Sequence, residues 1–199
     1  EWTCHVGIAT EKNGRWRRTM EDAHLYLQDF NNVPGQGYFA IFDGHAGKFA
    51  AEWCRDNMNR ILSEELNVCP HMDVREVMRN AFLKADEQLE AESRSAGVRS
   101  GCTAVTSLIR LESDDSDQNK SRRRVLYTAN VGDARSVLWY VDTSVCRLQL
   151  LTMNASRGGK AIRLTYDHKG SDEFESKRIT EKGGFLLNSR VNGACNLCV

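Results

Sequence analysis

The feature that most constrains the fold is an apolar run that ends at an acidic and a basic side chain. The run covers residues 38–47 and ends with Asp43, Gly44 and His45 before a short Ala-Gly turn. An apolar segment of strand length that is bounded by a turn signal is typical of a buried β-strand. We therefore expect a carboxylate, a glycine and an imidazole at the end of a core strand, where glycine lets a metal or a phosphate approach the backbone. On its own, Asp-Gly-His is equally compatible with an ordinary turn.

A second group of charged residues precedes this run. Arg17 and Arg18 are followed by Glu21 and Asp22, and residues 23–30 alternate well enough to form a second strand that leads away from them. The sequence thus places two carboxylates and two guanidinium groups just before one strand, and a carboxylate and an imidazole at the end of the next.

The two segments, Arg-x-x-Met-Glu-Asp and Phe-Asp-Gly-His-Ala-Gly, resemble the metal-dependent serine/threonine protein phosphatases of the PPM, or type 2C, family. Further segments that are similar to this family follow in the same order, at residues 100–104, 127–135, 164–169, 183–184 and 189–193. Because several motifs occur in the family's order, the resemblance is specific. It covers nearly all of the chain, but only part of the family's domain.

The resemblance implies an α+β fold, namely an α/β/β/α sandwich of two mostly antiparallel sheets flanked by helices, without the family's C-terminal strands. Residues 1–193 are expected to form a partial PPM-type phosphatase domain, and residues 194–199 a divergent tail. Residues 141–156 do not fit the family pattern. We interpret them as an unspliced or misannotated insertion, with a genuine extra hairpin as the alternative.

Hydrophobic periodicity predicts the individual elements. Apolar residues at spacings of three and four predict an amphipathic helix over 46–66 and a second helix that begins after Asp73, with Glu76 completing a capping box. The other predicted elements are strands at 3–9 and 102–111, a hairpin of 125–131 with 135–141, and a helix at 172–182.

For the metal site, the resemblance implies two Mg²⁺ or Mn²⁺ ions, with a third at a weaker site. Asp43 would bridge the two ions, while Glu21 and the backbone carbonyl of Gly44 would complete one of them. Asp133 could be a turn former or an acidic group that faces the metals, and the resemblance favours the second role, as a ligand of the additional ion. Hard divalent cations prefer such oxygen ligands, and they lower the barrier to phosphate hydrolysis by neutralising charge and activating water.

The resemblance also assigns three residues around the metals. Arg17 would bind the substrate phosphate, because its planar guanidinium matches two phosphate oxygens. His45 would protonate the leaving serine or threonine oxygen, and Asp22 would lie behind the metal ligands and orient metal-bound water. The alternatives are a surface ion pair for Arg17 and a helix cap for His45.

Composition narrows the partners and the compartment. Lys plus Arg and Asp plus Glu number 27 each, so the net charge gives no argument for binding nucleic acid or a membrane surface. Seven cysteines without a regular framework favour a reduced cytoplasmic or nuclear protein over a disulfide scaffold. The partners expected from the resemblance are phosphorylated proteins, and the chain is expected to be a monomer.

The resemblance further implies two aspartates from the family's C-terminal third, which this sequence does not contain. We therefore expect this form to bind metals weakly and to be weakly active or inactive. One alternative is a catalytically dead module that binds phosphoproteins. A more distant alternative is a small metal-binding or redox domain built on cysteines such as Cys195 and Cys198, although a structural zinc site would need a second ligand pair.

Overall fold

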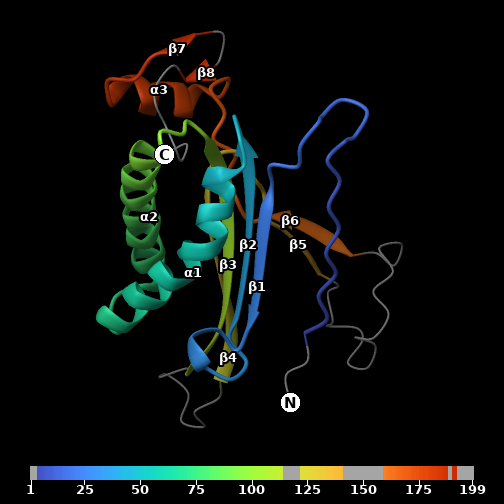
Figure 1. Cartoon of the computed structure of the whole chain (residues 1–199). Coiled ribbons are helices and arrows are strands. Elements are labelled where there is room, and N and C mark those ends of the chain that lie inside the picture. Colours follow the sequence, from blue (N-terminus) through green and yellow to red (C-terminus); the bar gives the residue numbers. More distant parts are fainter. Residues whose placement is uncertain (1–3, 114–121, 141–158, 188–189, 192–199) are drawn as a thin grey trace.

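The centre of the structure is a four-stranded antiparallel sheet (Figure 1). The computed structural model describes residues 4–113, 122–140, 159–187 and 190–191. The strands of the sheet lie in sequence order and are β1 (Ala23–Gln28), β2 (Gly37–His45), β3 (Gly101–Ser113) and β4 (Arg122–Val131).

Two long helices, α1 (Phe49–Val68) and α2 (Val74–Ala96), cover one face of this sheet (Figure 1). Because side chains alternate along a strand, Tyr38 and Phe42 of β2 are buried beneath the helices, whereas Ile41 on the other face is 52% exposed. Alternate side chains of β2 therefore pack into the core, and the polar end of the strand, from Asp43 to His45, lies at the edge of that core.

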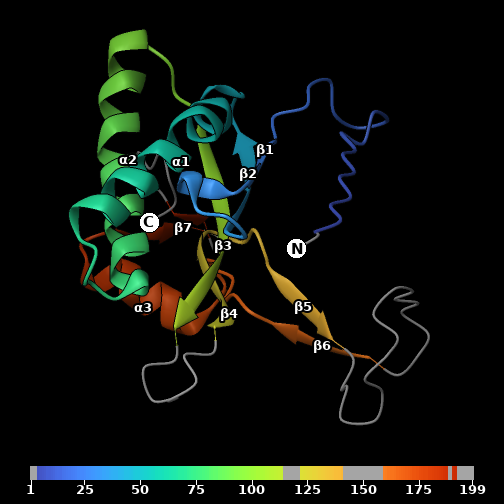
Figure 2. The ribbon, with the colours of Figure 1, turned by 90° about the horizontal axis from the view of Figure 1, so that it is seen from below.

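Shorter elements complete the described part of the chain. They are the 3₁₀ turn η1 (Phe30–Asn32), strands β5 (Val137–Tyr140) and β6 (Lys160–Arg163), helix α3 (Glu173–Glu181), and strands β7 (Leu186–Leu187) and β8 (Arg190–Val191). Strands β5 and β6 pair with each other on the side of the main sheet that faces away from α1 and α2 (Figures 1 and 2). They form a second sheet, so the predicted α+β class is confirmed.

Most predicted elements are found near their expected bounds, including both long helices and the strand that ends at His45. Helix α2 begins after Asp73, whose carboxylate accepts a hydrogen bond from the Arg75 backbone N–H at 2.8 Å. The predicted strand over 23–30 ends earlier, at Gln28, because Asp29 has a φ of 50°, which is incompatible with an extended strand.

The predicted hairpin of 125–131 with 135–141 is wrong. Strand β4 pairs with β3, whereas β5 pairs with β6 in the second sheet. The turn between them contains Gly132, whose φ of 83° redirects the chain from one sheet to the other. The residues that link β4 to β5 therefore lie where the two sheets meet.

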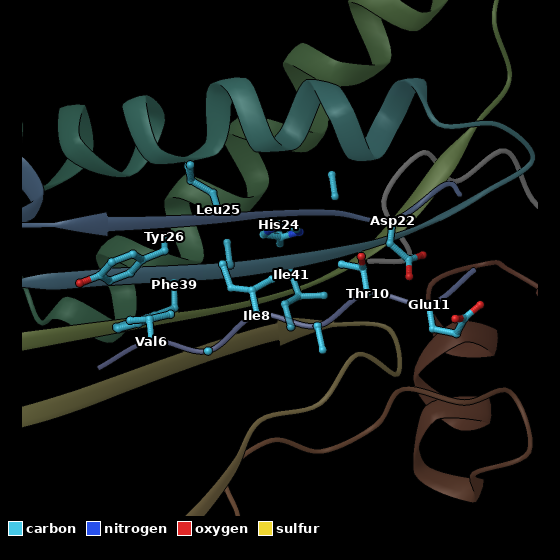
Figure 3. A pocket seen from close by; sticks show the side chains of 14 residues that line it. Val6, Ile8, Thr10, Glu11, Asp22, His24, Leu25, Tyr26, Phe39 and Ile41 are labelled. Carbon is cyan, nitrogen blue, oxygen red and sulfur yellow. The ribbon is translucent and has the colours of Figure 1, made fainter. Parts of the chain in front are cut away.

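The predicted strand over residues 3–9 is also wrong, since the described residues 4–9 form no regular element. Instead, this segment runs beside the outer face of β1 and β2 (Figure 3). A cavity of about 420 Å³ lies between the segment and the two strands, and it is lined from the strands by side chains such as Tyr26 of β1 and Phe39 of β2. Asp22 lies at one end of this cavity.

The atypical segment at 141–156 and the tail at 194–199 lie outside the described residues. Within the described part, none of the helices is both long enough and apolar enough to cross a lipid bilayer.

Candidate active site

The candidate site is built on the register of two neighbouring strands. Ala23 of β1 lies opposite Phe42 of β2, so Asp22 and Asp43 become neighbours at the same end of the sheet. Asp22 immediately precedes β1 and Asp43 lies near the end of β2. A backbone pairing that is set by the hydrophobic core therefore brings two carboxyl groups together.

The electrostatics of Asp43 show which groups surround it. Partial desolvation raises the pKa of this carboxyl, and the neighbouring carboxylates of Asp22 and Asp133 raise it further. A hydrogen bond with the Asp22 side chain acts in the same direction, whereas the positive charge of Arg17 lowers the pKa. Three carboxyl groups and one guanidinium group therefore converge at the ends of β1, β2 and β4.

Gly44 is packed directly against the backbone of Glu21. A Cβ atom at position 44 would lie 2.2 Å from the carbonyl oxygen of Glu21 and 3.2 Å from the Cβ atom of Ala51. The Glu21 carboxylate accepts hydrogen bonds from the backbone N–H of Gly47, at 3.2 Å, and from the Thr19 hydroxyl, at 3.1 Å. Glu21 is thus held next to β2 and points toward the turn that leads into α1.

Arg17 and His45 are both exposed; Arg17 precedes Asp22 in the sequence and His45 follows Asp43. Arg17 belongs to a turn in which its backbone N–H donates to the carbonyl of Asn13 at 3.0 Å. His45 is the last residue of β2 and pairs with Gly101 of β3. The structure therefore brings Arg17 near Asp43 and leaves the His45 imidazole open to solvent at the end of the same strand.

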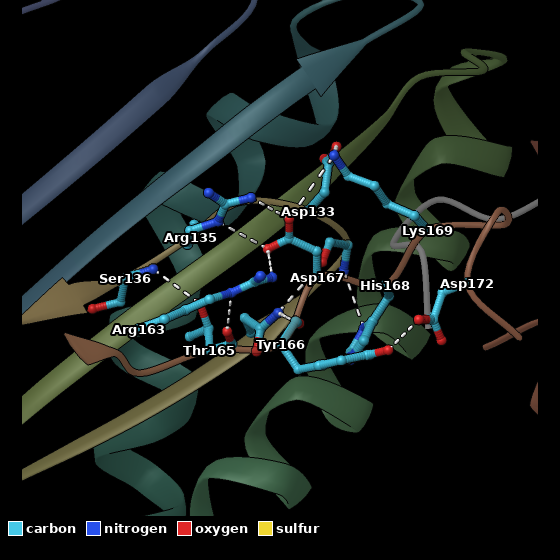
Figure 4. A network of polar contacts seen from close by, with 12 residues as sticks. Asp133, Arg135, Ser136, Arg163, Thr165, Tyr166, Asp167, His168, Lys169 and Asp172 are labelled. Carbon is cyan, nitrogen blue, oxygen red and sulfur yellow. Dashed lines mark hydrogen bonds and ion pairs between the residues drawn. The ribbon is translucent and has the colours of Figure 1, made fainter. Parts of the chain in front are cut away.

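Asp133 is connected to a network of charged side chains beyond β4 (Figure 4). The Lys169 ammonium lies 3.4 Å from the Asp133 carboxylate and 3.8 Å from that of Asp167. Asp167 also forms ion pairs with Arg135 and Arg163. The hydrogen bond from Arg135 is the main cause that lowers the pKa of Asp167 to about 2.

Sequence reasoning assigned no role to Asp167 and Lys169. The signal was present, because both belong to the segment 164–169 that resembles the phosphatase family. The segment crosses the end of β4, where the His168 backbone N–H donates to the Gly132 carbonyl at 2.9 Å. Asp167 and Lys169 thus fix the position of the turn that carries Asp133.

The carboxyl groups offer the type of ligand that a hard divalent cation prefers. The negative charge of Asp22, Asp43 and Asp133 is partly offset by the Arg17 guanidinium and by the Lys169 ammonium, which lies 3.4 Å from Asp133, and oxygen ligands are those that Mg²⁺ and Mn²⁺ prefer. Among the residues that the structure describes, no three aspartate, glutamate, histidine or cysteine side chains form a ligand cluster by themselves. The ligand roles of Glu21 and Gly44 stay predictions.

The cysteines in the described ranges are free thiols. Cys54 of α1 and Cys102 of β3 are both buried in the core, with their sulfur atoms 3.7 Å apart. Such burial is typical of free cysteines that act as small apolar core residues. Cys195 and Cys198 lie outside the described residues, so the cysteine-based alternative stays a prediction.

Sequence comparisons connect this arrangement to known proteins. The profile of the family described as Protein phosphatase 2C matches residues 6–198. The chain is 42% identical over 196 residues to Protein phosphatase 2C homolog 1 of Saccharomyces cerevisiae, covering 96% of this chain and 63% of the yeast protein. It is 39% identical to Protein phosphatase 2C homolog 1 of Schizosaccharomyces pombe, covering 94% of this chain and 47% of that protein. The chain therefore spans less than two thirds of the length of these relatives.

Solved structures show the same fold. A Caenorhabditis elegans sex determining protein superimposes with a TM-score of 0.63 at 26% identity, over 91% of this chain and 40% of that chain. A serine-threonine phosphatase 2C from Toxoplasma gondii superimposes with a TM-score of 0.59 at 20% identity, over 85% of this chain and 52% of that chain. From its sequence profile and its fold, the chain belongs to the protein phosphatase 2C family.

Proposed function

We propose that this chain acts in the metal-dependent hydrolysis of phosphoserine and phosphothreonine in phosphoproteins. The observation that carries the proposal is the convergence of Asp22, Asp43 and Asp133, with the positively charged Arg17 near Asp43. Family membership supports the same reaction class. Clustered carboxylates bind cations and repel a free phosphate group, whereas an adjacent arginine can bind the phosphate.

In this proposal, the residues of the chain have separate tasks. The carboxylates of Glu21 and Asp43 would hold the cations, and Asp133 would hold a further ion more weakly. Bound Mg²⁺ or Mn²⁺ would neutralise phosphate charge and supply a hydroxide nucleophile at neutral pH. Arg17 would orient the phosphate through two of its oxygens, and the exposed imidazole of His45 would give a proton to the leaving oxygen.

The direct test is hydrolysis of a phosphothreonine peptide by the purified chain with increasing Mn²⁺. We expect weak phosphate release that requires Mn²⁺ and that is lost in Asp43→Asn. Asp56→Asn is a matched control, because Asp56 is an exposed α1 residue whose main partner is the adjacent Arg55. His45→Gln should lower the rate by about a hundred- to ten-thousand-fold. Equal activity of Asp43→Asn and Asp56→Asn would contradict the proposal.

Two further measurements separate this proposal from its alternatives. Peptide binding without turnover, lost in Arg17→Gln, would favour a phosphoprotein-binding module. Calorimetric titration with Mn²⁺ would measure how well the chain holds metal without requiring catalysis. The expectation that this 199-residue form is weakly active or inactive stays a prediction that the two measurements together test.

We further propose a monomer that is located in the cytoplasm, the nucleus or both. Support for the compartment comes from the cysteine pattern, since the four cysteines that the structure describes are free thiols. Sedimentation would test the oligomeric state, and imaging of the tagged protein would test the compartment.

A further inference from the structure

One lysine lies against a carboxylate of the acidic group and has no task in the proposed reaction. The Lys169 ammonium is 3.4 Å from the carboxylate of Asp133, in the turn that follows β4 (Figure 4). Asp133 is in turn close enough to Asp43 for its negative charge to raise the pKa of the Asp43 carboxyl. Lys169 therefore places a positive charge directly at one member of the acidic group.

The other acidic neighbour of Lys169 is already neutralised. Asp167 lies 3.8 Å from the Lys169 ammonium, but it also forms ion pairs with the guanidinium groups of Arg135 and Arg163. The Asp167 side chain is only 9% exposed, whereas that of Asp133 is 45% exposed and open to ions from solution. The Lys169 ammonium is therefore the charge that a dissolved cation would meet at Asp133.

The segment that carries Lys169 is held in place by contacts other than its ammonium. The His168 backbone N–H donates to the Gly132 carbonyl at 2.9 Å. The Asn130 side-chain amide donates to the Tyr166 carbonyl at 2.7 Å. The Lys169 side chain is half-exposed, and its flexible four-carbon stem lets the ammonium turn toward water. The ammonium can therefore leave its ion pair while the segment stays in place.

We infer that Lys169 competes with a divalent cation for the Asp133 carboxylate and thereby weakens the binding of the additional cation. The inference rests on the proposed metal-dependent function and adds a residue that sets the metal affinity. An ammonium and a doubly charged cation repel each other at ion-pair distance, so binding of the cation requires the lysine to move away. An exposed ion pair is weak, so this exchange is possible but lowers the apparent affinity for the cation.

The test titrates the purified chain with Mn²⁺ and measures free Mn²⁺ by electron paramagnetic resonance, which requires no turnover. Lys169→Met removes the charge and keeps an unbranched side chain. We expect the most weakly bound Mn²⁺ to bind roughly two- to fivefold more tightly than in the wild-type chain, as expected for the loss of an exposed ion pair. Lys169→Arg keeps the charge and should bind Mn²⁺ like the wild type.

The direction of the change separates competition from a purely structural role. If Lys169 only supported the turn that carries Asp133, its replacement by methionine would weaken Mn²⁺ binding or leave it unchanged. In the Asp133→Asn background, Lys169→Met should have no effect on Mn²⁺ binding, because the lysine acts through that carboxylate. A circular dichroism melt would confirm that the variants are folded.

Lys177→Met is the matched control, because Lys177 is an exposed lysine of α3 whose ion-pair partner is Glu181. This variant loses the same charge and should bind Mn²⁺ like the wild type. The inference is overturned if Lys169→Met binds Mn²⁺ no more tightly than Lys177→Met, or if the tightening persists in the Asp133→Asn background.

The outcomes also separate this inference from the proposed function. Phosphate release that requires Mn²⁺, without tighter binding in Lys169→Met, would keep the phosphatase proposal and remove Lys169 from it. Tighter Mn²⁺ binding in Lys169→Met without any phosphate release would keep the competition and refute the proposed reaction. Absence of Mn²⁺ binding in every variant would overturn both.

Discussion

Replacement of Gly44 by alanine would test whether the candidate site depends on close backbone packing. The added Cβ atom would lie 2.2 Å from the carbonyl oxygen of Glu21 and 3.0 Å from its carbonyl carbon. A tolerable carbon–oxygen contact is about 3.3 Å, so the overlap is about 1 Å. Both partners are main-chain groups next to paired strands, and neither can move like the end of a flexible side chain.

We therefore expect Gly44→Ala to lower the free energy of unfolding by about 3 kcal/mol, at the upper end of the usual cost of overpacking. The measurement is urea denaturation followed by circular dichroism. Because Glu21 would be displaced, calorimetric titration should also show weaker Mn²⁺ binding under conditions in which the variant is folded.

Gly7→Ala provides the control, because a Cβ atom there would meet no other atom within 4 Å. This change should alter the free energy of unfolding by less than about 1 kcal/mol. If Gly44→Ala were as stable as Gly7→Ala, the close packing of Glu21 against β2 would be refuted.

Three other predictions concern the supporting structure. The Tyr38 hydroxyl is buried without a partner among the described residues, so Tyr38→Phe should raise the free energy of unfolding by about 1 kcal/mol in urea. A Cβ atom on Gly132, which has a φ of 83°, would lie 2.6 Å from the Thr103 side chain, so Gly132→Ala should lower this free energy by about 2 kcal/mol. Arg135 and its neighbours lower the pKa of Asp167 to about 2, so Asp167 stabilises the folded state above its unfolded pKa of about 3.9. This stabilisation should be lost as the pH falls from the unfolded pKa of about 3.9 toward the folded pKa of about 2. Denaturation curves should then show that the difference in the free energy of unfolding between the wild-type chain and Asp167→Asn shrinks over this pH range.

Elements whose signal is local could be predicted from the sequence. Helix α2 has a cap at Asp73 and a continuous apolar stripe, and β2 has an apolar run that ends at a turn. Each pattern depends only on residues that are close in the sequence, so its reading does not require knowledge of the tertiary structure. The resemblance to a family then supplied candidate roles for Arg17 and Asp43.

Pairing between distant segments could not be predicted in the same way. The residues after Gly132 look like the second strand of a hairpin, but their partner, β6, begins at Lys160. The contact between Asp22 and Asp43 likewise depends on the β1–β2 register, and the ion pairs of Asp167 depend on a segment that crosses the end of β4. These features follow from which strands become neighbours, and local periodicity carries no such information.

The β1–β2 register links the charges of the site to aliphatic side chains far from it. A shift of β1 by one residue would take Asp22 out of register with Asp43 and would also turn Leu25 away from the helices. A misalignment of the acidic groups would therefore expose apolar side chains to water, and this exposure makes the shifted register energetically unfavourable. Substitutions in the core beneath α1 that shift this register should consequently impair the chemistry as well.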